Sequence, residues 1–205
     1  MMASGMSQRS LAFHGLAIKR HADAAAVASL TGQPVDAVQA ELEAAVAAGR
    51  AIEAKGAYSL TPLARVALAA GYGRDFADLR AHEAFVQAYH GFERINPELK
   101  QIITDWQTIN VRGALRANDH SDEDYDNKVI DRLSALHERF EPVMVALTRG
   151  LSRLGIYGRK LEAALDKAED GEIAWVSDIH RDSYHTVWFE LHEELLRIMG
   201  TEREE

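Results

Sequence analysis

The sequence predicts a mainly α-helical chain, with an N-terminal winged helix-turn-helix and small β-hairpin over residues 8–73 and a helical bundle over residues 74–200. Apolar residues recur at helical spacing along most of the 205 residues. Two short β-compatible segments flank a Lys-Gly pair after the third expected helix. Charge also divides the chain: residues 1–75 carry seven basic and six acidic side chains, and the remainder carries 16 basic and 26 acidic ones, so the acidity belongs to the second part.

Two short helices are expected first. Ser10 is a suitable N-cap for a helix whose apolar residues include Leu16. Asp23 is a suitable cap for the second helix, which should stop at Thr31-Gly32 because glycine commonly ends helices. These local signals place two helices before residue 33.

A third helix should begin at Pro34, because proline is favoured in a first turn, and should end near Gly49. Segments 51–54 and 57–60 then fit a hairpin, and Thr61-Pro62 is typical of the cap and first residue of a fourth helix. The core-facing residues of the third helix are spaced as one helical face: Val35, Val38, Leu42, Ala45 and Val46.

The third helix of a winged helix-turn-helix usually enters the major groove of DNA. Here no Lys or Arg occurs between Pro34 and Gly49, and the helix offers Asp36 and Glu43, whose carboxylates repel phosphates. The sequence therefore favours protein contacts for this module and disfavours DNA without excluding it. The candidate nucleic-acid contacts are Lys19, Arg20, Gln39, Arg50 and Lys55.

Helical periodicity continues through the second part. Asn96-Pro97 is typical of a helix start, and Pro142 should kink a helix or begin a new one. Residues 118–126 are polar and acidic, so we expect a loop in which Ser121 and Asp124 form the capping box of the next helix. The expected helices are 76–91, 96–109, about 121–140, 142–154, 160–168 and 182–199.

The last expected helix carries a second stripe beside its main apolar one. A helix that is apolar on two sides is buried on both, in a bundle core or at an interface. His185 and His192 share a face but stand about 10.5 Å apart along the axis, too far to bind one zinc ion. We expect a ligand or partner interface at Tyr184, His185, Trp188, Phe189 and His192.

The residues that several kinds of catalytic and metal site require are absent from the sequence. Cysteine is absent, which excludes disulfides, Cys-based zinc fingers and thiol nucleophiles. No Glu-x-x-His, HExxH, Gly-x-Ser-x-Gly or P-loop pattern occurs, and the pair His137 and Glu141 is weak support for a metal. We therefore expect no catalytic residue, no metal and no cofactor. No apolar run approaches the ~20 residues of a membrane span, so a cytoplasmic chain without membrane contact is expected.

Two stretches resemble known proteins. Residues 13–20 (FHGLAIKR), 23–28 (DAAAVA) and 35–49 resemble a small winged-helix module of actinobacterial relatives of pyruvate phosphate dikinase and phosphoenolpyruvate synthase. Residues 182–195 (DSYHTVWFELHEEL) are similar to a tail segment of the same proteins. The ATP-grasp, phosphohistidine and phosphoenolpyruvate-binding domains of that family have no match in the sequence. The resemblance implies an accessory or regulatory protein associated with phosphotransfer, without the chemistry itself.

The leading hypothesis is a non-catalytic interaction or regulatory protein, in which the bundle binds a protein partner, a second copy or a small ligand. One alternative is a ligand-responsive transcriptional regulator that binds DNA as a dimer. A second alternative is an all-α metal or small-molecule enzyme, which the missing catalytic motifs disfavour.

Overall fold

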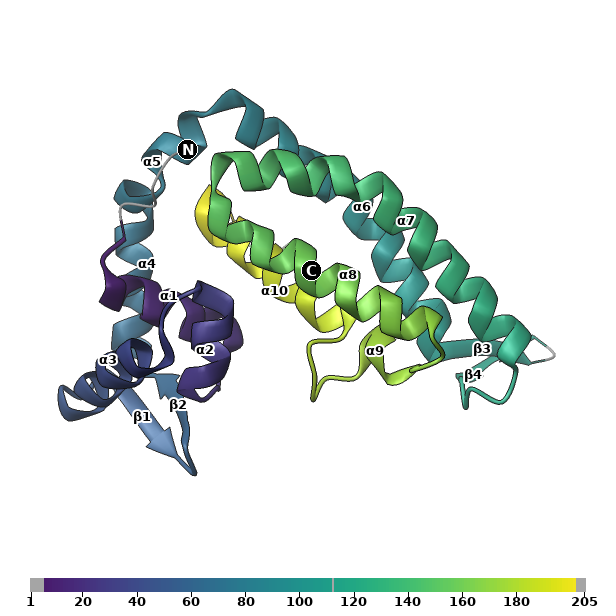
Figure 1. Ribbon diagram of the computed structural model, residues 1–205, viewed down its shortest axis with the longest axis horizontal. Helices are drawn as coiled ribbons and strands as arrows, with labels where there is room; N and C mark the ends of the chain where they lie inside the picture. The colour runs from purple at the N-terminus through teal and green to yellow at the C-terminus, as the bar shows by residue number, and fades with distance from the viewer. Residues whose placement is uncertain (1–5, 112, 202–205) are drawn as a thin grey trace. The chain divides into compact units, whose positions relative to one another are not determined.

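The computed structural model describes residues 6–111 and 113–201, and it is mainly helical (Figure 1). The chain divides into two compact units. The N-terminal unit comprises Met1–Glu83 and Glu190–Glu205, and the bundle unit comprises Ala84–Phe189. The division therefore falls inside the last helix, whose two halves belong to different units. The boundary expected between residues 73 and 74 stays a prediction, which would be tested by whether residues 8–73 fold alone.

The N-terminal unit contains three helices, a hairpin and two further helices. In order these are α1 (Gln8–Lys19), α2 (Ala24–Thr31), α3 (Val35–Ala47), β1 (Ala51–Ala54), β2 (Ala57–Leu60), α4 (Pro62–Asp75) and α5 (Ala77–Ala81). Asp23 and Thr61 cap α2 and α4 through their side-chain oxygens, as predicted. The cap of α1 is Ser7, which accepts from the Ser10 backbone amide, so the expected cap at Ser10 was wrong by one turn.

Antiparallel pairing of β1 with β2 confirms the predicted hairpin, with Ala51 opposite Leu60 and Ala54 opposite Ala57. Lys55 and Gly56 both have positive φ, 53° and 81°. A two-residue turn that matches the right-handed twist of its two strands requires such values at both positions. The core beneath the hairpin is built from α1, α2, α3 and the inward side of the strands. The helices α1 and α2 approach closely at Gly15, where a Cβ atom would lie 2.6 Å from Thr31 Cγ2.

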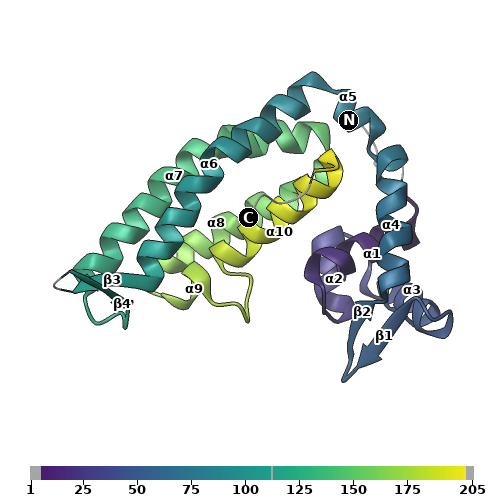
Figure 2. The same cartoon turned by 180° about the vertical axis from the view of Figure 1, so that it is seen from behind.

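Long helices dominate the bundle unit. Its elements are α6 (Glu83–Gln107), β3 (Thr108–Val111), β4 (Ala114–Ala117), α7 (Glu123–Gly150), the 3₁₀ turn η1 (Ser152–Leu154), α8 (Gly155–Glu169), α9 (Ala174–Ser177) and the first part of α10 (Tyr184–Met199). Figures 1 and 2 both show α6 and α7 side by side along most of their length. Among the described residues, no helix is long and apolar enough to cross a membrane.

The structure differs from several sequence expectations for this unit. The helix start expected at Asn96-Pro97 was wrong, because Pro97 lies inside α6. Pro142 was expected to kink a helix or begin a new one; it lies inside α7, and no new helix begins there. Both prolines are exposed, so water can satisfy the carbonyl groups that lose their donors, while buried residues on either side keep each helix packed. The β3–β4 hairpin was not expected, and Asp122, one residue after the expected Ser121, caps α7.

Candidate functional site

Two of the residues expected at an interface, Tyr184 and Trp188, lie in the core of the bundle unit. The Trp188 ring stacks on Phe92 at a centroid distance of 4.8 Å and meets Phe140 at 4.5 Å. Its indole Nε1 donates to Asn96 Oδ1 at 3.1 Å. Tyr184 is fully buried as well. These two aromatic side chains therefore hold α10 to α6 and α7.

The other three expected interface residues differ in burial. His185 and Phe189 are half-buried, and His192 is buried. His192 belongs to the part of α10 that is assigned to the N-terminal unit, whereas His185 and Phe189 belong to the bundle unit.

The N-terminal unit contains a buried polar chain that the sequence did not reveal. The His14 ring is fully buried, with Nδ1 3.0 Å from Tyr72 Oη and Nε2 3.4 Å from Glu194 Oε1. Glu194 is also fully buried. One turn earlier on α10, the Glu190 carboxylate pairs with Lys19 Nζ at 2.7 Å. Two buried carboxylates of α10 therefore bind basic or imidazole groups of α1.

The candidate nucleic-acid contacts are not equivalent. Lys19 is half-buried, and Glu190 binds its ammonium group. The Gln39 amide donates to Tyr58 Oη at 2.8 Å and to Glu43 Oε1 at 2.6 Å, so both of its contacts are within the unit. Arg20, Arg50 and Lys55 are exposed.

The exposed side of α3 lacks cations. Its carboxylates belong to Asp36 and Glu43, and its large apolar side chains are Val35 and Val46. The prediction that these two valines face the core was therefore wrong, since only Val38, Leu42 and Ala45 of α3 are buried. The remaining fully exposed positions of the helix are alanines: Ala40, Ala44 and Ala47. This surface presents negative charge and apolar area.

A cavity of about 470 Å³ lies in the N-terminal unit, between the start of α1, the α3–β1 junction and the start of α4. Apolar side chains and two arginines line it, and no carboxylate does. The lining residues are Arg9, Ser10, Phe13, Ala48, Gly49, Arg50, Thr61, Leu63, Ala64, Ala67 and Leu68. Hereafter we call this space the α1–α4 cavity.

A smaller cavity of about 270 Å³ lies between α7 and α8 in the bundle unit, and its lining includes His137, Glu141 and Glu162. The His137 Nδ1 atom is 3.0 Å from Tyr184 Oη. Over residues 6–111 and 113–201, no three His, Asp or Glu side chains are grouped so that they could hold a metal ion. The pair His137 and Glu141 therefore has no third ligand in the described part of the chain.

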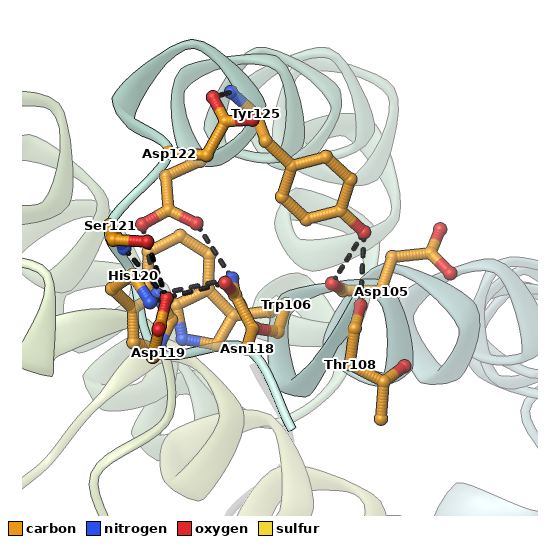
Figure 3. A network of polar contacts seen from close by, with 10 residues as sticks. Asp105, Trp106, Thr108, Asn118, Asp119, His120, Ser121, Asp122 and Tyr125 are labelled. Carbon is orange, nitrogen blue, oxygen red and sulfur yellow. Dashed lines mark hydrogen bonds and ion pairs between the residues drawn. The ribbon is translucent and has the colours of Figure 1, made fainter. Parts of the chain in front are cut away.

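Figure 3 shows a third polar group, between the end of α6 and the start of α7. Asp126, a buried carboxylate, accepts from Asn118 Nδ2 at 2.8 Å and lies 2.9 Å from His120 Nδ1. The Tyr125 hydroxyl donates to the carbonyl oxygens of Asp105 and Thr108. The network satisfies the last carbonyl groups of α6 and fixes the chain that enters α7, which is a structural role.

Hydrogen bonding and burial shift two pKa values in this network. Hydrogen bonds from the Ser121 hydroxyl and amide hold the pKa of Asp119 below its ordinary value. Burial raises the pKa of the Tyr125 hydroxyl. Asp119 therefore stays ionised and Tyr125 stays protonated at neutral pH.

None of the protein-family models matches this chain, and neither does any curated protein or solved structure.

The buried hydroxyl of Tyr184 makes the bundle unit sensitive to alkali. Burial raises its pKa above the ordinary 10.0, so the unfolded chain loses this proton before the folded chain does. Its contribution to stability is complete below pH 10 and is lost as the pH rises above that value. We expect Tyr184→Phe to lose less stability than the wild type from about pH 9 to about pH 11, measured by urea unfolding with tryptophan fluorescence. Equal losses in the two proteins would contradict this.

Proposed function

We propose that the chain is a non-catalytic interaction or regulatory protein, whose N-terminal unit is a winged helix-turn-helix that contacts a protein and not DNA. The element order α1, α2, α3, hairpin, α4 is that of such a module, and α3 is the helix that would enter a major groove. The observation that carries the proposal is the exposed side of α3, which presents Asp36, Glu43 and apolar side chains and no cation.

DNA binding needs two properties that α3 lacks. Base edges are read chiefly by Arg, Lys, Asn and Gln, and the Gln39 amide already bonds to Tyr58 and Glu43. Affinity for any duplex rests on cations that displace counterions from phosphates, and two carboxylates on this helix oppose that attraction.

Exposed apolar side chains support a protein partner. Of the nine large hydrophobic side chains exposed in the described residues, five lie on α3, β1 and the first turns of α4: Val35, Val46, Ile52, Leu63 and Val66. An exposed apolar surface is a feature of protein interaction sites, and this unit carries more than half of these exposed side chains. The resemblance in residues 13–20, 23–28, 35–49 and 182–195 supports a phosphoenolpyruvate- or ATP-dependent phosphotransfer enzyme as the partner, with this chain as its accessory subunit.

The experiment compares two binding targets for the full chain. A pyruvate phosphate dikinase-type enzyme from the same cell is the protein target, measured by sedimentation velocity. A labelled mixed-sequence duplex is the DNA target, measured by fluorescence anisotropy at low and high salt. We expect binding to the enzyme and none to the duplex beyond that of a neutral control protein.

Matched valine substitutions locate the contact. Val35 and Val145 have similar exposed fractions, 49% and 50%, but only Val35 is on α3. Val35→Asp should weaken binding to the enzyme about tenfold or more, and Val145→Asp should change it little. Salt-sensitive duplex binding that is lost in Arg50→Gln or Lys55→Gln would support the transcriptional regulator and contradict our proposal. Absence of enzyme binding would remove the accessory role.

A further inference from the structure

We propose that the α1–α4 cavity binds a small amphipathic carboxylate, that is, a molecule with an apolar body and one carboxylate group. The volume of about 470 Å³ is within the range of small-molecule sites, roughly 300–1,000 Å³. This inference goes beyond the proposed function, because it concerns a small ligand within the N-terminal unit and not a protein contact. The cavity lining and the apolar surface proposed for the protein partner share one residue, Leu63.

Hydrogen bonds fix the walls of the cavity. Thr61 donates to the Arg50 carbonyl oxygen twice, from its backbone amide at 2.9 Å and from its hydroxyl at 3.1 Å. The Arg50 amide donates in turn to the Ala45 carbonyl at 2.8 Å. The α3–β1 junction is therefore held against the start of α4, so the space between them is preformed.

The lining separates into an apolar and a cationic part. Phe13, Leu63 and Leu68 are the large apolar side chains of the lining, and Leu63 is 79% exposed. A ligand with an apolar body would cover part of that exposed surface and gain the corresponding hydrophobic free energy.

Both charged residues of the lining are arginines. Arg9 Nε pairs with Glu41 at 2.8 Å, so its charge is already partly compensated. Arg50 forms no ion pair with any carboxylate of the described residues. Because guanidinium groups bind carboxylates through paired hydrogen bonds, Arg50 selects an anionic group over a neutral or cationic one. The Ser10 and Thr61 hydroxyls are further polar groups of the lining.

The test uses the full chain and three probes of equal length: octanoate, octanol and octylamine. Binding is measured by isothermal titration calorimetry and located by amide chemical shifts in NMR spectra. We expect octanoate to bind more tightly than octanol, octylamine to bind most weakly, and the largest shifts at residues 48–50 and 61–68. Equal binding of octanoate and octanol would overturn the proposal, and so would absence of octanoate binding.

Matched variants test whether Arg50 supplies the charge that binds the carboxylate and whether the ligand binds in the α1–α4 cavity. Arg50→Gln should weaken octanoate binding about tenfold and leave octanol binding unchanged. Arg65→Gln removes an exposed arginine of α4 that does not line the cavity, and it should have little effect. Ala67→Phe should fill the cavity and abolish binding, whereas Ala69→Phe, on α4 outside the lining, should not. Circular dichroism would show that each variant is folded. Octanoate binding that survives Ala67→Phe in a folded protein would place the site elsewhere and overturn the proposal.

Discussion

Replacing Glu194 by alanine should lower the free energy of unfolding of the N-terminal unit by about 3–5 kcal/mol. The carboxylate is fully buried and lies 3.4 Å from His14 Nε2, so its removal takes the charged partner from an imidazole that water cannot reach. The substitution also leaves an empty space where four side-chain heavy atoms were packed, which adds to the loss.

Hydrogen exchange followed by mass spectrometry measures this effect, because it resolves the two units. All three tryptophans, Trp106, Trp175 and Trp188, belong to the bundle unit, so fluorescence alone would not report on the N-terminal unit. Peptides from α1 and α4 should lose protection in Glu194→Ala.

The neighbouring residue provides a matched control. Glu193 pairs with Arg197 at 3.5 Å, and the two side chains keep 15% and 28% of their surface exposed, whereas His14 and Glu194 keep none. Glu193→Ala should therefore cost clearly less than Glu194→Ala, about 1–2 kcal/mol. Glu194→Gln keeps the shape and an oxygen acceptor, and it should fall between the two alanine variants. If Glu193→Ala and Glu194→Ala destabilised the unit equally, the His14–Glu194 contact would not be the cause.

Replacing Trp188 by alanine should destabilise the bundle unit by about 3–5 kcal/mol. The indole is 98% buried and packs between Phe92, Phe140 and Tyr184. The substitution also removes the donor to the buried Asn96 amide oxygen, and an unsatisfied buried acceptor costs a further ~1–3 kcal/mol where the cavity does not admit water.

Trp175 is the control for this prediction, since it is a tryptophan of the same unit that is only half-buried. It contacts Lys167 Nζ, 3.7 Å from its ring centroid, and donates to Glu172 Oε2. Trp175→Ala should cost about 1 kcal/mol. Urea unfolding would be followed through the fluorescence of Trp106, which is present in both variants.

The Trp188→Ala variant also distinguishes a core role for Trp188 from an interface role. A residue at a free interface can be truncated with little loss of stability and a large loss of partner binding. A stable Trp188→Ala protein that no longer binds its partner would therefore contradict the core role and support the interface expected from the sequence.

Much of the N-terminal unit could be predicted because its signals are local. Asp23 and Thr61 cap the helices that directly follow them, and Lys55-Gly56 forms the turn between two strands that it joins. Each feature depends on atoms within four residues along the chain, so the sequence pattern contains the information needed to place it.

Predictions failed where distant packing decided the outcome. Asn96-Pro97 has the local pattern of a helix start, yet the Asn96 side chain accepts a hydrogen bond from Trp188, 92 residues away, and α6 continues through Pro97. The burial of apolar residues along a 25-residue helix offsets the ~3 kcal/mol that an interior proline costs.

The candidate sites show the same distinction. The sequence alone determined the absence of cations on the third helix and the charge difference between the two parts, because both follow from composition. Only the tertiary structure decided that Trp188 is in a core, that His14 meets Glu194 across 180 residues, and that Arg9 and Arg50 line one cavity. Composition can be counted from the sequence, and the geometry of caps and turns depends on residues close together in the chain. Burial and long-range pairing depend instead on which distant segments pack against each other and exclude water.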